Sequence, residues 1–392
     1  MLVAEDVARR RQEPKIRNPF HYGDLVADES FTDRDDELKQ LKSDILNGHN
    51  VALIAPRRYG KSSLVRAALS DLVGRGVLVV EVDLMATPTK ERLAGKLAKS
   101  IDSDIAPTVF KAKEHLRFFQ SLRVAPVVTV DADGGFSFSF SASRAPEEID
   151  DTLERLLELP ATVASDTGKE VVVYFDEFQE VTQIDPALPA LMRSVFQQQQ
   201  HVSHVYAGSK RHMMHRLFNH ENEPFYRSAK TMEIGLIPVT LFKAFVRERF
   251  DASERGVSDD VLDRLLATTR GHPYATQELA YALWEEVPRG FTATADDLDH
   301  ALRAVLHAEN AHFTLVWEKT TKPQKLLLQA LASETGKPFS VSYRDRHGLP
   351  SSSHVQRALK PLIEDELIDK EERGSYDIAQ PFLREWILAY VS

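Results

Sequence analysis

A phosphate-binding loop is the first feature of this sequence that could do chemistry. Residues 55–62 read Ala-Pro-Arg-Arg-Tyr-Gly-Lys-Ser and fit the pattern G-x-x-x-x-G-K-[ST] except at the first position, where alanine replaces glycine. In such a loop, successive backbone N–H groups point inward and bind an anion, and the following helix adds its unpaired N-terminal donors. The loop therefore predicts a site for the phosphates of a nucleoside triphosphate.

Individual loop residues have distinct expected roles. Lys61 would reach the outer phosphates as a point charge, the Ser62 hydroxyl would hold Mg²⁺, and Gly60 would let the chain pass close to the phosphates. Ala55 would cost about 1 kcal/mol if its position required a positive φ. The alternative is a chance Gly-Lys-Ser, but an apolar strand precedes the loop and an apolar helical face comes after it. The residues expected to line the nucleotide are Ala55, Pro56, Arg57, Arg58, Tyr59, Gly60, Lys61, Ser62 and Ser63.

Two adjacent carboxylates follow a second apolar run. Residues 171–178 read Val-Val-Val-Tyr-Phe-Asp-Glu-Phe, and such a continuous run is typical of a fully buried parallel strand. Asp176, at the C-terminal end of this strand, would lie beside the phosphate loop and bind Mg²⁺, and Glu177 would orient and deprotonate the attacking water. The alternative is a strand that ends in solvated acids. Because the chain has both the loop and this strand, we favour nucleoside triphosphate hydrolysis.

The elements that must position these residues alternate between strands and helices. This order predicts an α/β fold in which a parallel sheet carries helices on both faces. Ligands of such open sheets bind at the C-terminal ends of the strands. The expected strands are 51–54, 77–84, 171–176, 204–207 and 232–237. The candidate site residues at such ends are Lys61, Asp176, Glu177 and Ser209.

Residues 105–145 interrupt the alternation and are expected to form an insertion. Residues 127–130 and 136–140 alternate apolar with polar side chains on either side of a glycine-containing turn. This pattern predicts a β-hairpin.

The composition places limits on the class of protein. The chain has 392 residues, enough for two or three domains, and 43% hydrophobic and 28% charged residues are ordinary for a soluble globular protein. It has no cysteine, which excludes disulfides, thiolate metal sites and thiol catalysis. No apolar stretch approaches the roughly 20 residues that span a bilayer, and the N-terminus shows no secretory pattern, so we expect a cytoplasmic location. The net charge of −10 argues against broad, nonspecific affinity for nucleic acid.

The C-terminal half has a different pattern. From Pro238 onward the sequence is helical, and residues 322–392 read as helix, helix and two short strands. This order is typical of a winged helix. The module contains ten Lys or Arg and ten Asp or Glu, whereas DNA-reading modules usually carry a basic surface. We therefore rank protein docking or a lid function above duplex binding, although Arg357 and Lys360 lie on the expected recognition helix.

Six short motifs resemble the archaeal ATPase family, which also occurs in bacteria and belongs to the AAA+/STAND group of P-loop ATPases. The resemblance covers roughly residues 18–390 and implies ATP as the nucleotide, Mg²⁺ as the metal, and an AAA+/ASCE nucleotide-binding domain followed by a small helical lid and a winged helix. Ala55 and the bulky Tyr59 depart from the family pattern. The motifs are Asn18-Pro-Phe with Phe31-Thr-Asp-Arg34, Ala55-Pro-Arg-Arg-Tyr-Gly-Lys-Ser62, Phe175-Asp-Glu-Phe-Gln179, Ala207-Gly-Ser209, Phe225-Tyr-Arg227 and Gly271-His-Pro273.

The resemblance also implies roles for residues outside the loop and the acidic strand. Ser209 falls where this group keeps a polar sensor of the γ-phosphate, and Arg227 falls where related proteins place an arginine finger that serves a neighbouring subunit. Phe31 and Arg34 would approach adenine or its ribose, and the motif ending at Pro273 would close over the nucleotide. Arg227 could instead be an ordinary surface arginine.

These observations lead to a domain division and to three hypotheses of function. The expected parts are an N-terminal arm (1–17), an ATPase core with the insertion (18–238), a helical lid (239–318) and a winged helix (319–392). The first hypothesis is a Mg²⁺-dependent ATPase that couples its nucleotide state to conformational change or assembly, with a homo-oligomer completed by Arg227. The second is an ATP-dependent regulatory switch with little turnover and an unknown protein partner. The third is a DNA-binding regulator of the replication or transposition type.

Overall fold

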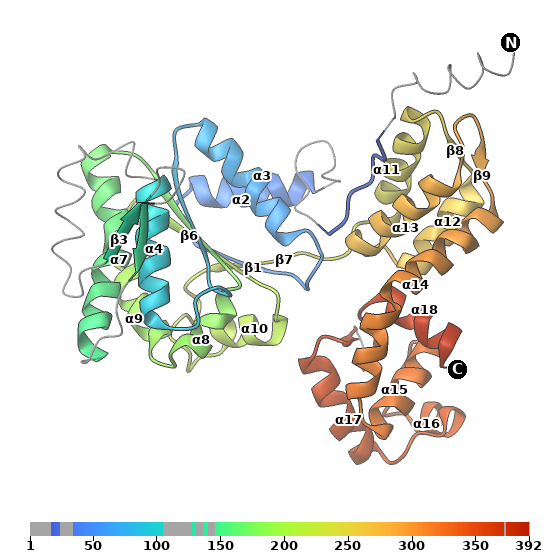
Figure 1. Cartoon of the computed structure of the whole chain (residues 1–392). Coiled ribbons are helices and arrows are strands. Elements are labelled where there is room, and N and C mark those ends of the chain that lie inside the picture. The colour runs from blue at the N-terminus through green and yellow to red at the C-terminus, as the bar shows by residue number, and fades with distance from the viewer. Residues whose placement is uncertain are drawn as a thin grey trace, which may run out of the picture. The chain divides into compact units, whose positions relative to one another are not determined.

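The structure, a computed structural model, describes residues 17–23, 34–104, 127–130, 136–139, 146–371 and 374–391, with the backbone alone for 127–130, 136–139 and 146–147. The chain divides into two compact units (Figure 1). Residues 34–235 form the first unit, and residues 236–392 form the second together with the described N-terminal segment 17–23. The expected arm at 1–17 lies outside the described residues except for its last residue.

A five-stranded parallel sheet forms the centre of the first unit, in the order β2-β5-β6-β1-β7. This confirms the predicted α/β fold with a parallel sheet. The three inner strands are buried almost throughout because both of their faces are covered. β1 and β5 are apolar runs, whereas β6 also contains buried Ser203 and His204. β6 lies between the acidic strand β5 and the loop strand β1. The strands are β1 (Val51–Ile54), β2 (Leu78–Asp83), β5 (Val171–Asp176), β6 (Val202–Gly208) and β7 (Lys230–Glu233).

Helices cover both faces of this sheet (Figure 1). On one face, α2 (Asp35–Leu46) packs against α3 (Lys61–Gly74). The hydrophobic core of the unit lies on the other face, where aromatic rings such as those of Phe175, Phe178 and Tyr206 contact one another. The helices of that face are α4 (Lys90–Asp104), α7 (Pro146–Thr167), α8 (Val181–Ile184), α9 (Leu188–Phe196) and α10 (Arg211–Asn219).

The predicted hairpin is present in the insertion. Strands β3 (Val127–Val130) and β4 (Phe136–Ser139) pair antiparallel, with Val130 opposite Phe136. β4 lies beside α4. The remaining residues of the predicted insertion at 105–145 lie outside the described part of the chain.

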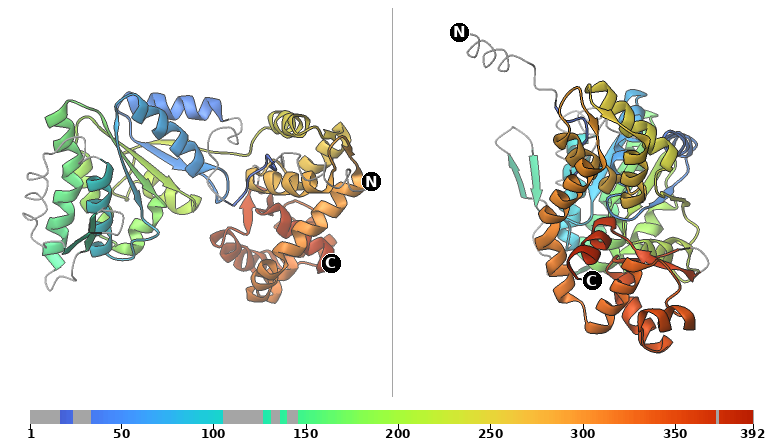
Figure 2. Two further views of the ribbon diagram at one scale, coloured as in Figure 1. Left: turned by 45° about the horizontal axis from the view of Figure 1, so that its top comes forward. Right: turned by 90° about the vertical axis from the view of Figure 1, so that its right-hand side faces the viewer.

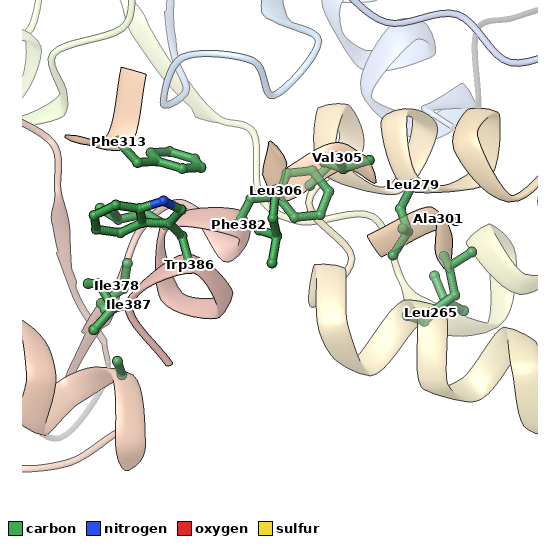
Figure 3. Packing of buried hydrophobic residues seen from close by; sticks show 14 of the residues in the cluster. Leu265, Leu279, Ala301, Val305, Leu306, Phe313, Ile378, Phe382, Trp386 and Ile387 are labelled. Atoms are coloured by element: carbon green, nitrogen blue, oxygen red, sulfur yellow. The ribbon is translucent and has the colours of Figure 1, made fainter. Parts of the chain in front are cut away.

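The second unit combines a helical module with the predicted winged helix. The long helix α14 packs against α13 in the first module and α18 in the second. As a result, one hydrophobic core runs through both, from Leu265 and Leu279 to Phe313 and Trp386 (Figure 3). The helices of the first module are α11 (Val239–Ala252), α12 (Asp259–Thr269), α13 (Pro273–Glu286) and α14 (Ala295–Lys319), and its short strands are β8 (Gly256–Val257) and β9 (Thr292–Ala293). Those of the winged helix are α15 (Lys322–Ser333), α16 (Val341–His347), α17 (Ser352–Glu364), β10 (Ile368–Lys370), β11 (Tyr376–Ile378) and α18 (Pro381–Tyr390).

The N-terminal segment packs on the helical module. The Asn18 side chain donates hydrogen bonds to the Tyr281 carbonyl (3.1 Å) and to Glu285 (3.0 Å). The ring of Phe20 is buried against Phe245 and Phe250. The structure therefore groups residues 17–23 with the helices of the second unit, whereas the motifs predict that residues 18–33 belong to the ATPase core. The domain boundaries at 238 and 318 remain predictions.

Figure 2 shows the sheet of the first unit and the helices of the second from two further directions. None of the helices in the described parts of the chain combines the length and the apolar character needed to span a membrane.

Candidate functional site

The phosphate loop connects β1 to the first turn of α3, as the sequence predicts. Gly60 has φ +82° and Arg58 has φ +66°, so these two residues adopt the left-handed backbone conformation within the loop. Ala55 is not among the residues with positive φ in the described chain. It is buried, and its N–H donates to the Gly208 carbonyl on β6 at 3.3 Å. Alanine at position 55 therefore carries none of the expected backbone strain.

Lys61 lies between the two carboxylates at the end of β5. Its Nζ is 3.0 Å from Glu177 Oε1 and 3.3 Å from Asp176 Oδ1, and only 6% of its side chain is exposed. A buried ammonium is stable only when it is paired, and here both partners are supplied by the strand that the sequence singled out. Lys61 is also the first residue of α3, and helix N-termini are sites where anions bind.

Ser62 and Asp176 meet across the site. The Ser62 hydroxyl donates to Asp176 Oδ2 at 3.2 Å. A hydroxyl and a carboxylate are both hard oxygen donors, and Mg²⁺ is held by one or two such groups together with phosphate oxygens and water. The two predicted metal ligands thus fit the ion that the sequence implied.

Glu177 has an unusual backbone and a crowded carboxylate. Its φ of 51° and ψ of 47° are left-handed, which costs a residue with a side chain roughly 1 kcal/mol or more. Ser209 Oγ donates to its Oε2 at 2.7 Å, whereas Lys61 contacts its Oε1. Burial alone would raise the pKa of the Glu177 carboxyl, but the charge of Lys61 and the donated hydrogen bonds hold that pKa below its ordinary value. Glu177 is therefore ionised at neutral pH.

Two further contacts at this edge were not found from the sequence. Gln179 donates to Glu177 Oε2 at 2.5 Å, and Lys210 pairs with Glu180 at 2.9 Å. Gln179 belongs to the Phe175–Gln179 motif, but a glutamine two residues after an acid reads as an ordinary polar side chain. The usable signal would have been its position two residues after the pair of carboxylates at the end of a buried strand.

Arg34 is buried at the base of the loop. Its guanidinium donates to the carbonyls of Gly235 (2.7 Å) and Tyr59 (3.3 Å) and pairs with Glu37 at 3.0 Å. These contacts tie the phosphate loop to the segment after β7. The expected approach of Arg34 to adenine or ribose stays a prediction, and Phe31 lies outside the described residues.

Other predicted site residues lie apart from the carboxylates. Arg227 is exposed in the loop between α10 and β7, where its backbone N–H bonds to the Phe218 carbonyl at 2.9 Å. Arg57 is also exposed, at the tip of the phosphate loop. The roles of these arginines remain predictions.

Pro273 is the first residue of α13 in the second unit, directly after the helix cap His272. His272 Nδ1 accepts a hydrogen bond from the Ala275 N–H at 3.3 Å. Gly271 has φ +71°, and a Cβ there would lie 2.9 Å from the Ile237 carbonyl, so this motif requires glycine. Closure of the motif over a nucleotide stays a prediction.

The solved structures that resemble nearly the whole chain include the following two. The Walker-type ATPase paby2304 of Pyrococcus abyssi has a TM-score of 0.65 at 16% identity, over 94% of this chain and 99% of that chain. The ORC2 protein of Aeropyrum pernix, solved in ADPNP–ADP complexes, has a TM-score of 0.54 at 14% identity, over 95% of this chain and 97% of that chain. At such identities the likeness shows the fold alone.

The sequence of the C-terminal module matches a known family. Residues 311–389 match the family described as "Probable winged helix domain". No curated protein matches the chain significantly. The chain therefore has a P-loop ATPase fold with a parallel sheet, followed by helices and a winged-helix domain, and it is similar in structure to the Walker-type ATPase of Pyrococcus abyssi.

Proposed function

We propose that this protein is a Mg²⁺-dependent AAA+/STAND-type ATPase that binds and hydrolyses ATP. One observation carries the proposal: residues predicted from separate segments meet at one edge of the sheet, with hydrogen bonds and ion pairs between them. These residues are Lys61, Ser62, Asp176, Glu177 and Ser209. The two similar folds support the ATPase class, since one belongs to a Walker-type ATPase and the other was solved in ADPNP–ADP complexes.

Each residue of the site has a proposed role in this reaction, and that of Ser209 is to sense the γ-phosphate, as the family resemblance implies. Lys61 and the loop N–H groups bind the phosphates, and Ser62 and Asp176 would hold Mg²⁺, which neutralises phosphate charge when bound. Glu177 accepts a proton from the attacking water, whose oxygen forms a bond to the γ-phosphorus while the bond to the β–γ bridging oxygen breaks. The products are ADP and inorganic phosphate.

The ion pairs of Lys61 suggest how nucleotide binding changes the protein. Lys61 contacts both carboxylates directly. A triphosphate at the loop competes with these carboxylates for the same ammonium, so its arrival changes the charge environment of Glu177. This competition links the occupancy of the loop to the ends of β5 and β6, and it supports coupling between nucleotide state and conformation.

The test of this proposal is substitution of the predicted base. Glu177→Gln keeps the size of the side chain but removes the proton acceptor, so ATP binding is retained and kcat falls by roughly 10²–10⁴-fold. Steady-state phosphate release and equilibrium binding of ATP, measured on the same preparation, check both parts. Unchanged turnover in this variant would reject Glu177 as the base.

The geometry of the winged helix supports duplex DNA binding as a second proposed function, although the equal number of acidic and basic residues in this module ranks it below the first. The turn between α16 and α17 presents exposed serines at the start of α17, and Arg357 and Lys360 are exposed along it. Such a helix is the usual reader of a DNA groove. Salt-dependent duplex affinity that is lost on substitution of both basic residues would support this function, and absence of binding at low salt would dismiss it.

A further inference from the structure

A buried glutamine lies beneath the predicted base. Gln179 is 0% exposed and belongs to the short 3₁₀ turn η2 (Phe178–Glu180), which comes directly after β5 and Glu177. Its amide N–H donates to Glu177 Oε2 at 2.5 Å, and Glu180 Oε1 lies 3.5 Å from the same nitrogen. The proposed mechanism gives this residue no role, although it touches the carboxylate that accepts the proton.

The orientation of this amide is costly. Gln179 Oε1 is buried and makes no hydrogen bond, and an orphaned acceptor of this kind costs roughly 1–3 kcal/mol. Turning the amide over would place its oxygen, an acceptor, against a carboxylate that is itself only an acceptor when ionised. The orphaned oxygen is therefore the consequence of keeping the N–H on Glu177.

The neighbouring strand leaves room for Gln179. A Cβ at Gly208 would lie 2.5 Å from Gln179 Oε1 and 2.3 Å from Met214 Sδ. Glycine at the end of β6 thus lets the glutamine occupy the space directly under the site. The next residue, Ser209, donates to the same Oε2 of Glu177 at 2.7 Å.

Glu177 needs a donor that stays with it. Its left-handed backbone is a strained conformation that persists only where surrounding contacts hold it. Lys61 and Ser209 also hold its carboxylate, but the proposed function gives each of them a second partner, the phosphates. Gln179 is fully buried, so a nucleotide bound at the surface of the site would not compete for its hydrogen bond.

We propose that Gln179 is a positioning residue, whose amide holds Glu177 in place while Lys61 and Ser209 engage the phosphates. This inference rests on the proposed function and adds a residue to the same site. According to this inference, Gln179 contributes to the hydrolytic step but not to nucleotide binding.

The experiment compares Gln179→Met with Gln199→Met. Methionine is unbranched and similar in length but donates no hydrogen bond. Gln199 is a matched control, because its amide also donates a hydrogen bond, to the Leu157 carbonyl at 2.7 Å, and its side-chain oxygen is also buried without a partner. It lies more than 20 positions after the two carboxylates in the sequence. For Gln179→Met we expect ATP affinity within about twofold of wild type and a kcat lower by roughly 10–100-fold. The control should retain wild-type kcat.

The split between ATP binding and turnover separates positioning from mere stability. A residue that only orients Glu177 affects kcat and leaves the dissociation constant for ATP unchanged, whereas a general loss of folded protein lowers the number of ATP sites and the total activity together. An unchanged kcat per ATP site in Gln179→Met would overturn the inference.

If the wild-type protein shows no turnover, that result rejects the proposed function and leaves the kinetic test of Gln179 without a reference. A double-mutant cycle then tests the contact between Gln179 and Glu177 through stability. The midpoints of thermal unfolding are measured for Gln179→Met, Glu177→Ala and the double variant. We expect non-additive shifts, since the glutamine matters only while the carboxylate is present. If Gln179→Met alone fails to fold, the double variant should recover folding. Additive shifts would overturn the link between the two residues.

Discussion

Ser62, in the first turn of α3, donates a hydrogen bond to Asp176, the last residue of β5, across 114 positions of sequence. Asp176 and the loop strand β1 are not on neighbouring strands, because β6 separates β5 from β1. The helix after the loop brings Ser62 back to Asp176. This contact joins the two motifs that the sequence places far apart.

The first prediction concerns these two oxygen donors. Ser62→Ala removes one hard ligand, so the Mg²⁺ concentration that gives half-maximal ATP binding should rise by roughly tenfold, about 1.4 kcal/mol. Ser62→Thr keeps the hydroxyl, and its Mg²⁺ dependence should match wild type. Titration of Mg²⁺ at fixed ATP checks both variants. Equal Mg²⁺ dependence in Ser62→Ala and Ser62→Thr would remove Ser62 from the metal site.

The second prediction concerns the backbone of the loop. Gly60 has φ +82° and open space where a Cβ would lie, so Gly60→Ala should destabilise the protein by about 1 kcal/mol through strain alone. Gly74, at the end of α3, also has open space but no positive φ, so Gly74→Ala should stabilise by roughly 0.5–1 kcal/mol. Urea unfolding of the two variants measures the difference. Equal free energies of unfolding would contradict this assignment of strain.

Much of the first unit could be predicted from sequence because its signals are local. The residues of β1 and β5 are apolar, and this alone indicates that the two strands are buried. The phosphate-loop pattern predicts the helix that follows β1. The carboxyl ends of parallel strands share one edge, so the meeting of Lys61, Asp176 and Ser209 results from the order of the elements. The hairpin strands β3 and β4 were similarly visible as alternating patterns.

Other structural features depend on contacts between residues far apart in the sequence or on backbone angles, and the sequence patterns do not predict either. Phe20 packs against rings more than 200 positions away, so its motif gave no sign of which unit would bury it. The contact of Gln179 with Glu177 depends on the left-handed turn at Glu177, which a non-glycine residue rarely adopts. The absence of strain at Ala55 likewise depends on a backbone angle that the motif pattern does not contain.

The third prediction concerns pH and stability. His204 on β6 is buried, with its ring centroid 4.0 Å from that of Phe196, and burial lowers the pKa of His204 to about 3 from its ordinary 6.5. Between these two pKa values the histidine binds a proton in the unfolded chain but not in the folded chain. The free energy of unfolding therefore falls as pH falls, by at most about 1.4 kcal/mol per pH unit. Above pH 6.5 this histidine has no effect on the pH dependence.

Urea unfolding between about pH 7.5 and 4.5 tests this behaviour, since that range crosses the ordinary histidine pKa. His204→Phe should flatten the dependence below pH 6.5. His201→Asn is the control, since His201 is exposed just before β6 and pairs with Glu170 at the surface. A slope in His204→Phe as steep as in wild type would show that other groups account for the acid sensitivity.

The fourth prediction concerns Arg227. If this exposed arginine completes the site of a neighbouring copy, Arg227→Ala should lower kcat by roughly 10³-fold while ATP affinity is retained. Mixing Arg227→Ala with Lys61→Ala should then restore part of the activity, because each supplies what the other lacks. Arg216→Ala is the control, since Arg216 is also exposed but pairs with Glu223. Failure of the mixture to recover any activity would place Arg227 outside the site.

The central claim is that a triphosphate binds at the loop with Lys61 as its cationic partner. Calorimetric titration of ATP in magnesium buffer tests it most directly, with Lys61→Met and Lys90→Met as the compared variants. Lys90 is a matched lysine, because it too lies between two carboxylates of the same unit, Asp150 and Asp185. We predict saturable binding by wild type and Lys90→Met, and affinity lower by roughly tenfold or more in Lys61→Met. Absence of ATP binding by the wild-type protein, or equal affinity in all three, would contradict the account.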